Sequence, residues 1–241
     1  DVYKRQADLV ILSIFVNPAQ FGPNEDFDKY PRAFARDLAL AAERGVDCIF
    51  YPEAKELYPE GYLSWVNVER LTERLCGVSR PGHFKGVATI VTKLFNIVKP
   101  HCAVFGQKDA QQAAILQKMI IDLNFDIKFI LAPTKRESDG LAMSSRNVNL
   151  SPAERQEAPY IYMSLKSAAA KLLKSPEISQ KIAADTQKEL SEKISGKIDY
   201  LEILSYPELQ PFDRNISSKA IIALAVFYKN VRLIDNVMVE W

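Results

Sequence analysis

The residues best suited to chemistry in this chain lie in three short polar clusters, each directly after an apolar run. The clusters are Asn17-Pro-Ala-Gln20-Phe21, Gly106-Gln-Lys-Asp109 and Thr134-Lys-Arg-Glu-Ser-Asp-Gly140. Lysine and arginine can neutralise phosphate, and amide side chains can orient a small polar substrate. We interpret the clusters as parts of one binding site. Taken alone, the first cluster fits a plain turn better than a binding site for which Gln20 provides the contact.

The second cluster offers an anion site because it opens directly into a predicted helix. The first turn of a helix presents unpaired N–H groups and the positive end of the helix dipole. Lys108 adds a mobile cation suited to phosphate, and Asp109 can cap the helix or accept hydrogen bonds from a ribose. Gln111 and Gln112 bring amides that can hold a hydroxy acid. An ordinary turn from strand to helix is the alternative.

Two further segments carry cations and hydroxyl groups. Asp139-Gly-Leu-Ala-Met-Ser-Ser-Arg-Asn147 contains the donors needed to hold a triphosphate and stabilise leaving pyrophosphate, although an interdomain linker is the alternative. In Ser79-Arg-Pro-Gly-His83-Phe-Lys85, the cations line an anionic site or are simply solvated. His83 is one of two histidines and is weak evidence alone, and we expect His101 at the surface.

The elements that position these clusters alternate between strand and helix. Apolar runs predict strands over 8–17, 47–51, 102–106 and 126–131, and helical spacing predicts helices over 31–44, 87–98 and 109–123. This alternation predicts a parallel sheet, because parallel neighbours need helical crossovers. The first run is nearly continuous, so we expect a central strand buried on both faces. Ligands bind beyond the carboxyl ends of such strands, where the three clusters lie.

The pattern changes past Leu150, where Ser151-Pro-Ala-Glu154 forms a capping box at the start of a helix. Two amphipathic helices are predicted over about 152–174 and 176–195, then a strand over 198–204 and a hairpin of strands over 220–227 and 231–239. We therefore predict an α/β fold with a larger domain over residues 1–134 and a smaller α+β domain over residues 135–241.

Composition excludes several classes of protein. The 241 residues carry 31 basic and 30 acidic side chains, so the net charge of +1 provides no global field for nucleic acid or a membrane. The longest apolar stretches, such as 221–228, are far shorter than a bilayer span, and we expect a cytoplasmic protein. Cys48, Cys76 and Cys102 form no C-x-x-C pair and are interpreted as reduced core thiols rather than metal or redox groups.

Familiar motifs for other chemistries do not occur in the sequence. The glycines never fall as G-x-G-x-x-G or G-x-x-x-x-G-K-[ST], which argues against a dinucleotide dehydrogenase and a P-loop enzyme. No G-x-S-x-G supports a hydrolase, and no His/Cys grouping has the spacing of a zinc site. The phosphate chemistry that the clusters suggest must use another scheme.

Six motifs, taken together and in order, resemble the pantothenate synthetase family: Ser13-Ile-Phe-Val-Asn-Pro-Ala-Gln-Phe21, Tyr30-Pro-Arg32, Ser79-Arg-Pro-Gly-His-Phe84, Phe105-Gly-Gln-Lys-Asp-Ala-Gln-Gln112, Asp139-Gly-Leu-Ala-Met-Ser-Ser-Arg-Asn147 and Arg232-Leu-Ile-Asp-Asn236. The resemblance runs from about Ala7 to the C-terminus and leaves residues 1–6 unmatched. It implies a Rossmann-like first domain of the nucleotidylyl-transferase superfamily and a small C-terminal lid. A homodimer joined through the larger domain is also implied.

The resemblance also implies roles for individual residues. Its pantoate-holding glutamines fall on Gln20 and Gln112, with Gln20 also near the beta-alanine position. Its ATP contacts fall on Gly106, Gln107, Lys108, Asp109, Lys135, Met143, Ser144, Ser145 and Arg146, although a glutamate is common in the family where Gln107 stands. Lys108 and Arg146 would neutralise charge on the phosphates as catalytic groups. ATP and Mg²⁺ are implied as co-substrate and cofactor, and the metal ligands stay unassigned.

The implied reaction joins pantoate to beta-alanine in two steps. Pantoate attacks the α-phosphate of Mg-ATP to form pantoyl adenylate and pyrophosphate, and the amine of beta-alanine then displaces AMP. The lid would protect the adenylate from water. A related ligase that adenylates another hydroxy acid is an alternative, against which Gln20 and Gln112 together argue.

One family motif, H-x-G-H, does not occur in this sequence. In the family it lies upstream of the strand that begins here at Asp8. We therefore expect a fragment of a longer reading frame, in which residues 1–6 are foreign and neighbouring strands expose apolar edges. We also expect weak or no ligase activity from this polypeptide. A naturally shortened, non-catalytic nucleotide-binding protein is the second hypothesis.

Overall fold

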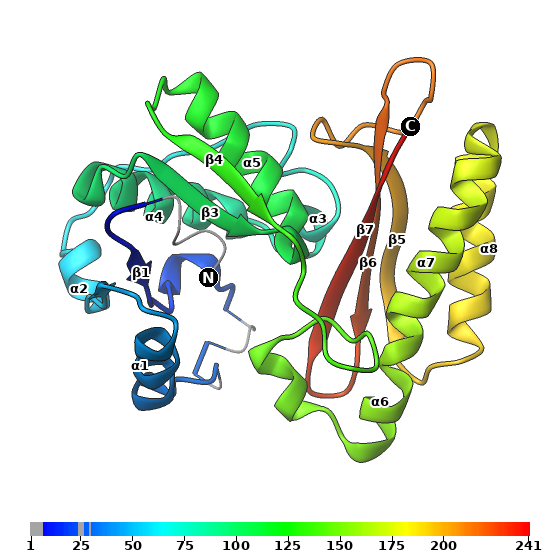
Figure 1. The fold of residues 1–241 in the computed structure, drawn as a ribbon, viewed down its shortest axis with the longest axis horizontal. Coiled ribbons are helices and arrows are strands. Elements are labelled where there is room, and N and C mark those ends of the chain that lie inside the picture. The colour runs from blue at the N-terminus through cyan, green and yellow to red at the C-terminus, as the bar shows by residue number, and fades with distance from the viewer. Residues whose placement is uncertain (1–6, 24–26, 29) are drawn as a thin grey trace.

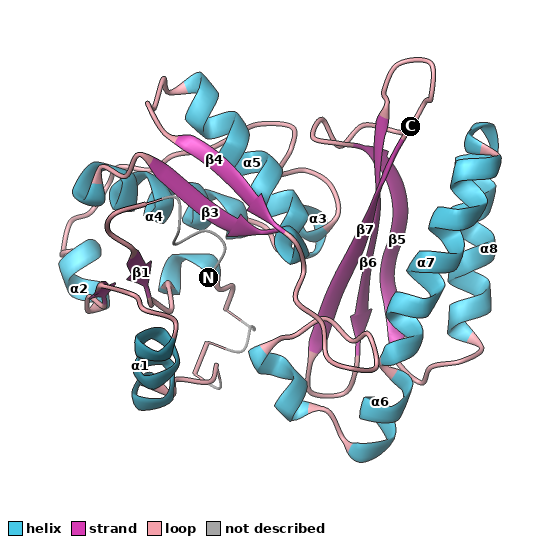
Figure 2. Cartoon of the chain, in the orientation of Figure 1, coloured by secondary structure: helices cyan, strands magenta, loops and turns pink. Residues whose placement is uncertain are grey.

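The computed structural model describes residues 7–23, 27, 28 and 30–241, and it places them in two packed units (Figure 1). Short parallel strands and helices make up the first unit, whereas an antiparallel sheet with helices on one side makes up the second (Figure 2). Residues 1–6, which we expected to be foreign, lie outside the described residues. No helix in the described part of the chain is long and apolar enough to cross a membrane.

Two parallel strand pairs organise the first unit. β1 (Ile11–Ser13) pairs with β2 (Cys48–Phe50), and β3 (Cys102–Gly106) pairs with β4 (Lys128–Ala132). The predicted parallel pairing is thus confirmed. The expected single sheet is wrong, because β1 and β3 share no ladder in the described part of the chain and the strands form two separate sheets.

Helices connect and cover these strands. They are the 3₁₀ helix η2 (Pro18–Gln20), α1 (Phe34–Glu43), α2 (Ala54–Leu57), α3 (Cys76–Ser79), α4 (His83–Val98), the 3₁₀ helix η3 (Gln107–Asp109) and α5 (Ala110–Asp122). The core of the unit lies where α4 packs against α5, with Val87, Ala88, Ile115 and Leu116 buried. Helices α2 and α3 fall in a stretch for which the sequence predicted no regular structure.

The expectation of a central strand buried on both faces over residues 8–17 is wrong. β1 spans three residues, all exposed, and Leu12 keeps 37% of its surface in contact with solvent. Its only ladder partner among the described strands is β2, so no second neighbour covers it. The core-thiol prediction holds for Cys76 alone, because Cys102 is half-buried and Cys48 lies exposed on β2; all three thiols are free.

The second unit is built on the sheet of β5 (Lys197–Ser205), β6 (Lys219–Phe227) and β7 (Arg232–Glu240). The predicted hairpin is confirmed, because β6 and β7 pair antiparallel over their whole length. The helices are α6 (Pro152–Glu157), α7 (Pro159–Lys174), the 3₁₀ helix η5 (Pro176–Ile178) and α8 (Ser179–Ser191). The single helix expected over 152–174 is therefore two helices, since Pro159 has no N–H to continue the helical ladder.

The sheet of the second unit buries both faces. Leu224 and Val226 on one face pack with Leu165 and Leu172 of α7. Figure 1 shows α7 and α8 lying beside this sheet. On the other face, Ile221 and Ala223 of β6 form a cluster with Leu75, Ala110 and Ala114 of the first unit. The two units therefore share a buried apolar junction. The domain boundary between residues 134 and 135 stays a prediction.

A polar cluster lies at the edge of this junction. Cys76 Sγ contacts Tyr200 Oη at 3.1 Å, and Arg232 donates to Asp199 Oδ2 at 2.7 Å. Ser79 donates to the same Asp199 oxygen at 2.8 Å. Burial, together with the nearby thiol of Cys76, raises the pKa of Tyr200 well above its ordinary value, so this hydroxyl stays protonated.

Candidate functional site

A cavity of about 50 Å³ lies at the junction of the two units, beyond the carboxyl end of β3. Four residues of the predicted site line it, namely Lys108, Asp109, Gln111 and Gln112. Arg80 and His83 line it from the segment where α3 ends and α4 begins. A space of this size admits a few water molecules or a small polar group rather than a nucleotide. The cavity is therefore one part of the predicted site.

The chain turn after β3 places Lys108 and Asp109. Gly106 ends β3 in an extended conformation, and η3 leads directly into α5. Lys108 is half-buried and Asp109 is exposed at the N-terminal end of α5, where helical N–H groups favour an anion. Asp109 does not cap α5 through its side chain, so the capping interpretation is wrong.

The two neighbouring glutamines have different roles. Gln111 is buried, with 6% of its surface exposed, and its amide is fully engaged. It accepts from the backbone N–H of Cys76 at 3.0 Å and donates to the carbonyls of Leu71 and Arg74. The expectation that Gln111 holds a hydroxy acid is therefore wrong, since its donors and acceptor stabilise the α3 turn. Gln112 is half-buried and lines the cavity.

The Asn17–Phe21 turn supports the opposite wall of the cavity through its backbone. The carbonyl of Gln20 accepts from His83 Nδ1 at 2.8 Å and from Arg80 Nη2 at 3.2 Å. Arg80 Nη1 lies 3.1 Å from His83 Nε2. Because a carbonyl only accepts and a guanidinium only donates, His83 carries a proton on Nδ1 and accepts at Nε2. The side chain of Gln20 itself does not line the cavity.

Close packing holds this turn against α4. Asn17 is buried and its amide donates to the carbonyl of Gly86 at 3.1 Å. A Cβ at Gly86 would lie 2.1 Å from the carbonyl oxygen of Ala19, so only glycine allows this approach. The turn is thus a fixed part of the first unit, and Asn17 acts in its structure.

The predicted second ATP segment forms an ordered hairpin. Met143 N–H donates to the carbonyl of Lys135 at 2.9 Å, so Lys135 lies beside the Met143–Arg146 segment. Gly140 turns the hairpin with a φ of +94°. Glu137 accepts from Asn147 Nδ2 at 2.7 Å and pairs with Arg155 at 2.6 Å. These contacts do not fit the alternative of a simple linker.

The tip of this segment meets the first unit away from the cavity. The guanidinium of Arg146 lies 4.9 Å from the centroid of the Tyr30 ring, and Ser145 Oγ lies 3.5 Å from Tyr30 Oη. Ser144 accepts from the N–H of Arg146 and starts the 3₁₀ helix η4 (Ser145–Asn149). The structure therefore brings Lys108, Asp109 and Gln112 together, and separately Lys135 with Met143–Arg146.

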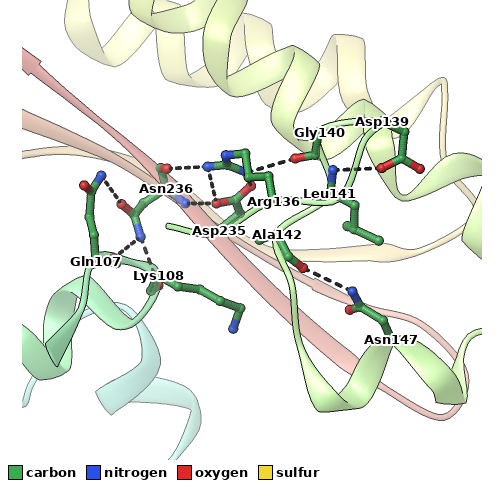
Figure 3. Close-up of polar contacts among 10 residues, drawn as sticks. All are labelled: Gln107, Lys108, Arg136, Asp139, Gly140, Leu141, Ala142, Asn147, Asp235 and Asn236. Carbon is green, nitrogen blue, oxygen red and sulfur yellow. Dashed lines mark hydrogen bonds and ion pairs between the residues drawn. The ribbon is translucent and has the colours of Figure 1, made fainter. Parts of the chain in front are cut away.

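Two residues of the site had no role in the sequence-based prediction. Asp235 and Asn236 of β7 line the cavity, and both are buried. Asn236 contacts the Gly106–Asp109 turn and Asp235 contacts Arg136, as Figure 3 shows. An aspartate and an asparagine inside an otherwise apolar strand are the signal that could have identified them, because buried polar groups need partners.

Within the described residues, no group of three or more His, Cys, Asp or Glu side chains is arranged to hold a metal ion. Asp109 is an exposed carboxylate at the cavity, whereas Asp235 is engaged by Arg136. A metal ion that reaches this site would thus need most of its ligands from water or substrate.

Polar groups beyond the carboxyl ends of parallel strands, backed by a second sheet, define an α/β protein that binds small molecules at its strand ends. The family profile described as Pantoate-beta-alanine ligase matches residues 2–238. The chain belongs to this family of ligases, which join pantoate to beta-alanine. Residues 2–6 fall within the match, so the expectation that they lie outside the resemblance is wrong.

Individual relatives agree with this assignment. Pantothenate synthetase of Pelotomaculum thermopropionicum is 53% identical over 97% of this chain and 82% of its own length. That of Acetivibrio thermocellus is 52% identical over 98% of this chain and 84% of its own length. The Rossmann-like architecture with a smaller C-terminal unit is shared with pantothenate synthetase from Thermus thermophilus, at a TM-score of 0.91 and 41% identity over 97% and 84% of the two chains.

A second solved structure contains ligands. It is the pantoate-beta-alanine ligase from Francisella tularensis, described as complexed with beta-gamma ATP and beta-alanine. The similarity has a TM-score of 0.77 and 33% identity, and it covers 97% of this chain and 80% of that one.

Proposed function

We propose that this chain condenses pantoate with beta-alanine at the expense of ATP, through a pantoyl-adenylate intermediate. The observation that carries the proposal is the convergence of Lys108, Asp109 and Gln112 at the N-terminal end of α5, in a chain of this family. A structural relative described as complexed with an ATP compound and beta-alanine supports ATP as co-substrate.

The chemistry requires two displacements. In the first, a carboxylate oxygen of pantoate bonds to the α-phosphorus of ATP, and the bond to pyrophosphate breaks. In the second, the amine of beta-alanine bonds to the acyl carbon and loses a proton, and AMP leaves with the electrons of the C–O bond. The products are pantothenate, AMP and pyrophosphate.

The residues divide this work by position. Lys108 and Arg146 stabilise negative charge on the phosphates, and the N-terminal end of α5 adds N–H groups. Gly106, Gln107, Asp109, Lys135 and the Met143–Ser145 segment contact the rest of the nucleotide. Gln112 holds pantoate from the cavity. Gln20 holds it from the opposite turn once its side chain rotates toward the cavity. Positioning of the two reactants supplies much of the rate in such reactions.

Mg²⁺ fits this site as an ion bound chiefly to the triphosphate. Magnesium commonly uses substrate phosphates with one or two carboxylates, and Asp109 is an exposed carboxylate at the cavity. Bound there, the ion would reduce the negative charge that the attacking carboxylate meets. Lys108 and Arg146 act on the same charge from the protein.

We also propose a homodimer joined through the first unit, and a cytoplasmic location. Leu9, Leu63 and Val78 of that unit are 62%, 87% and 69% exposed, and we propose that the dimer covers part of this apolar surface. Three free thiols fit a reducing compartment. Light scattering after size exclusion tests the dimer, and a monomer at micromolar concentration would contradict it.

The test of the reaction is pyrophosphate release that requires both pantoate and Mg-ATP, followed by AMP formation that requires beta-alanine. We expect both dependences. ATP binding without pyrophosphate release would instead favour a non-catalytic nucleotide-binding protein. Faster release with another 2-hydroxy acid than with pantoate would contradict the substrate. The rate relative to a full-length homologue tests the separate expectation of weak activity.

A further inference from the structure

β7 carries two adjacent buried polar residues whose side chains lie on opposite faces of its sheet. Asp235 is opposite Leu224 on the face covered by α7, and Asn236 is opposite Ala223 on the face that packs on the first unit. Successive strand residues alternate between faces, so one dipeptide reaches both sides. They are 4% and 3% exposed, which makes every unmade hydrogen bond costly.

Asn236 holds the turn that carries Lys108. Its Nδ2 donates to the carbonyl of Gln107 at 2.8 Å and to the carbonyl of Lys108 at 3.0 Å (Figure 3). Its Oδ1 accepts from Gln107 Nε2 at 3.4 Å. Both donors of the amide thus fix backbone carbonyls of one 3₁₀ turn, and the position of Lys108 relative to the sheet follows from them.

Asp235 holds the other predicted ATP segment through Arg136. The guanidinium donates to both carboxylate oxygens, at 2.6 and 3.0 Å, and also to the carbonyl of Gly140 at 3.1 Å. It lies 3.5 Å from the centroid of the Tyr162 ring of α7, so it is held on two sides. Such bidentate pairs restrict orientation as well as distance. The hairpin that presents Met143–Arg146 is therefore anchored on the helix-covered face.

The two anchors are joined to each other. The N–H of Asn236 donates to Asp235 Oδ1 at 2.8 Å, and Arg136 Nη2 lies 3.4 Å from the carbonyl of Asn236. The dipeptide is part of a strand with a nine-residue ladder to β6, which gives it a rigid base. A shift of either segment relative to the other would break contacts made by the same two residues.

We propose that Asp235 and Asn236 are positioning residues, which set the distance between the Gly106–Asp109 turn and the Met143–Arg146 segment so that one ATP molecule spans both. The inference rests on the proposed function, because that function makes both segments nucleotide contacts. Neither side chain needs to touch the nucleotide. Their effect passes through the carbonyls of the 3₁₀ turn and through Arg136.

The experiment measures amide hydrogen exchange and Mg-ATP binding on the same variants. Asn236→Ala should raise exchange in residues 107–112, and Asp235→Asn should raise it in residues 136–142, each by roughly tenfold. Both variants should weaken Mg-ATP binding by a similar factor. Ser79→Ala removes another hydrogen bond of the same junction and should change neither quantity.

Asn236→Asp separates polarity from packing. It conserves volume but sets a carboxylate oxygen against two carbonyls, so it should weaken Mg-ATP binding at least as much as Asn236→Ala. If Asn236 acted through packing alone, Asn236→Asp would bind Mg-ATP more tightly than Asn236→Ala. Slow exchange in β5 and β6 verifies the fold of each variant. Should Asp235→Asn unfold, Arg136→Lys keeps the charge, loses the bidentate geometry and carries the same expectation.

Two results would overturn the proposal. The first is unchanged exchange in both segments of the folded variants, which would show that the dipeptide holds neither. The second is raised exchange with unchanged Mg-ATP binding. If the unaltered chain does not bind Mg-ATP, the proposed nucleotide contacts are wrong, and the positioning role fails with them. The exchange data would then still show whether Asp235 and Asn236 hold the two segments.

The ligase assay gives a further measurement on the same variants. The KM for ATP should rise in both, and the KM for beta-alanine should stay constant.

Discussion

The strands of the two units differ in length, pairing and burial. β5, β6 and β7 each span nine residues and form one antiparallel sheet, whereas the parallel strands of the first unit span three to five residues and form two separate pairs. Leu224 of β6 is fully buried, and Leu12 of β1 is 37% exposed. The difference arises because α7 and α8 cover one face of the longer sheet and the first unit covers the other.

The comparison shows that the best-ordered sheet and the proposed binding residues lie in different parts of the molecule. The second unit, expected to be a lid, contains the best-packed sheet of the molecule. Most residues proposed to contact ATP and pantoate lie on turns of the first unit and on the hairpin between the units. Binding residues commonly lie on loops that a rigid scaffold positions. Here the scaffold is β7, which contacts both proposed nucleotide segments.

The largest expected effect concerns the packing difference itself. Leu224→Ala should lower the free energy of unfolding by about 2–5 kcal/mol, because it leaves a cavity between β6 and the helices. Leu12→Ala, the matched change on β1, should lower it by less than about 1 kcal/mol because this side chain is already partly solvated. Urea titration measures both. Equal losses would refute the comparison.

The second prediction separates chemistry from stability. Lys108→Met should lower pantoate-dependent pyrophosphate release by about 10²–10³-fold, since a preorganised charge near the phosphates is lost. It should change the free energy of unfolding by less than about 0.5 kcal/mol. Lys128→Met, at the opposite end of the adjoining strand, is the control and should leave the rate unaltered. A rate loss in both variants would point to a general charge effect.

The third prediction uses a buried tyrosine of the second unit. Burial raises the pKa of Tyr206 to about 12, and its hydroxyl has no hydrogen-bond partner. Its contribution to stability is fully present below about pH 10, the ordinary tyrosine pKa, and is lost as pH rises toward 12. We expect the free energy of unfolding to fall by about 2 kcal/mol over this window. Tyr206→Phe should remove that part of the fall, and an unchanged pH profile would contradict the assignment.

The smallest expected effect lies in the hairpin between the units. The hydrogen bond from Arg155 and the N–H of Leu141 lower the pKa of Asp139 below its ordinary value. Its stabilising contribution is present above about pH 4 and is lost as pH falls through the lowered pKa. The loss should be less than about 1 kcal/mol because this pair is solvated. Amide hydrogen exchange in residues 136–142 below pH 4, measured on the unaltered chain and on Asp139→Asn, tests this loss. If acid raised exchange in β6 more than in residues 136–142, the hairpin would not be the acid-sensitive region and the prediction would fail.

Much of the fold could be predicted because the pattern is local. The spacing of apolar residues predicted β3 at its observed bounds and the β6–β7 hairpin to within a residue or two. The break between α6 and α7 was not predicted, although Pro159 is visible in the sequence and a proline removes a helical hydrogen bond. The apolar run alone predicted a buried β1, since such a run shows the side chains and not the number of neighbours that cover them; only the absence of the H-x-G-H motif indicated exposed strand edges.

For the candidate site, the residue types alone indicated Lys108, Asp109 and Gln112 as a group, and the cavity contains all three. They also indicated Gln111, whose amide instead bonds the α3 turn. Two glutamines in sequence have the same chemistry, and only the hydrogen bonds that the fold gives Gln111 separate this structural side chain from Gln112, which we propose as a ligand contact.

By itself, the sequence determined the family, the alternation of strands and helices, and the turns that carry the charged groups. These depend on residue type and local spacing. Only the tertiary structure decided that the first sheet is split, that Asn17 and Gln111 serve packing, and that Asp235 and Asn236 contact turns more than 90 residues away in the chain. The physical reason is that a buried polar group must find a partner, and the identity of that partner depends on the whole fold.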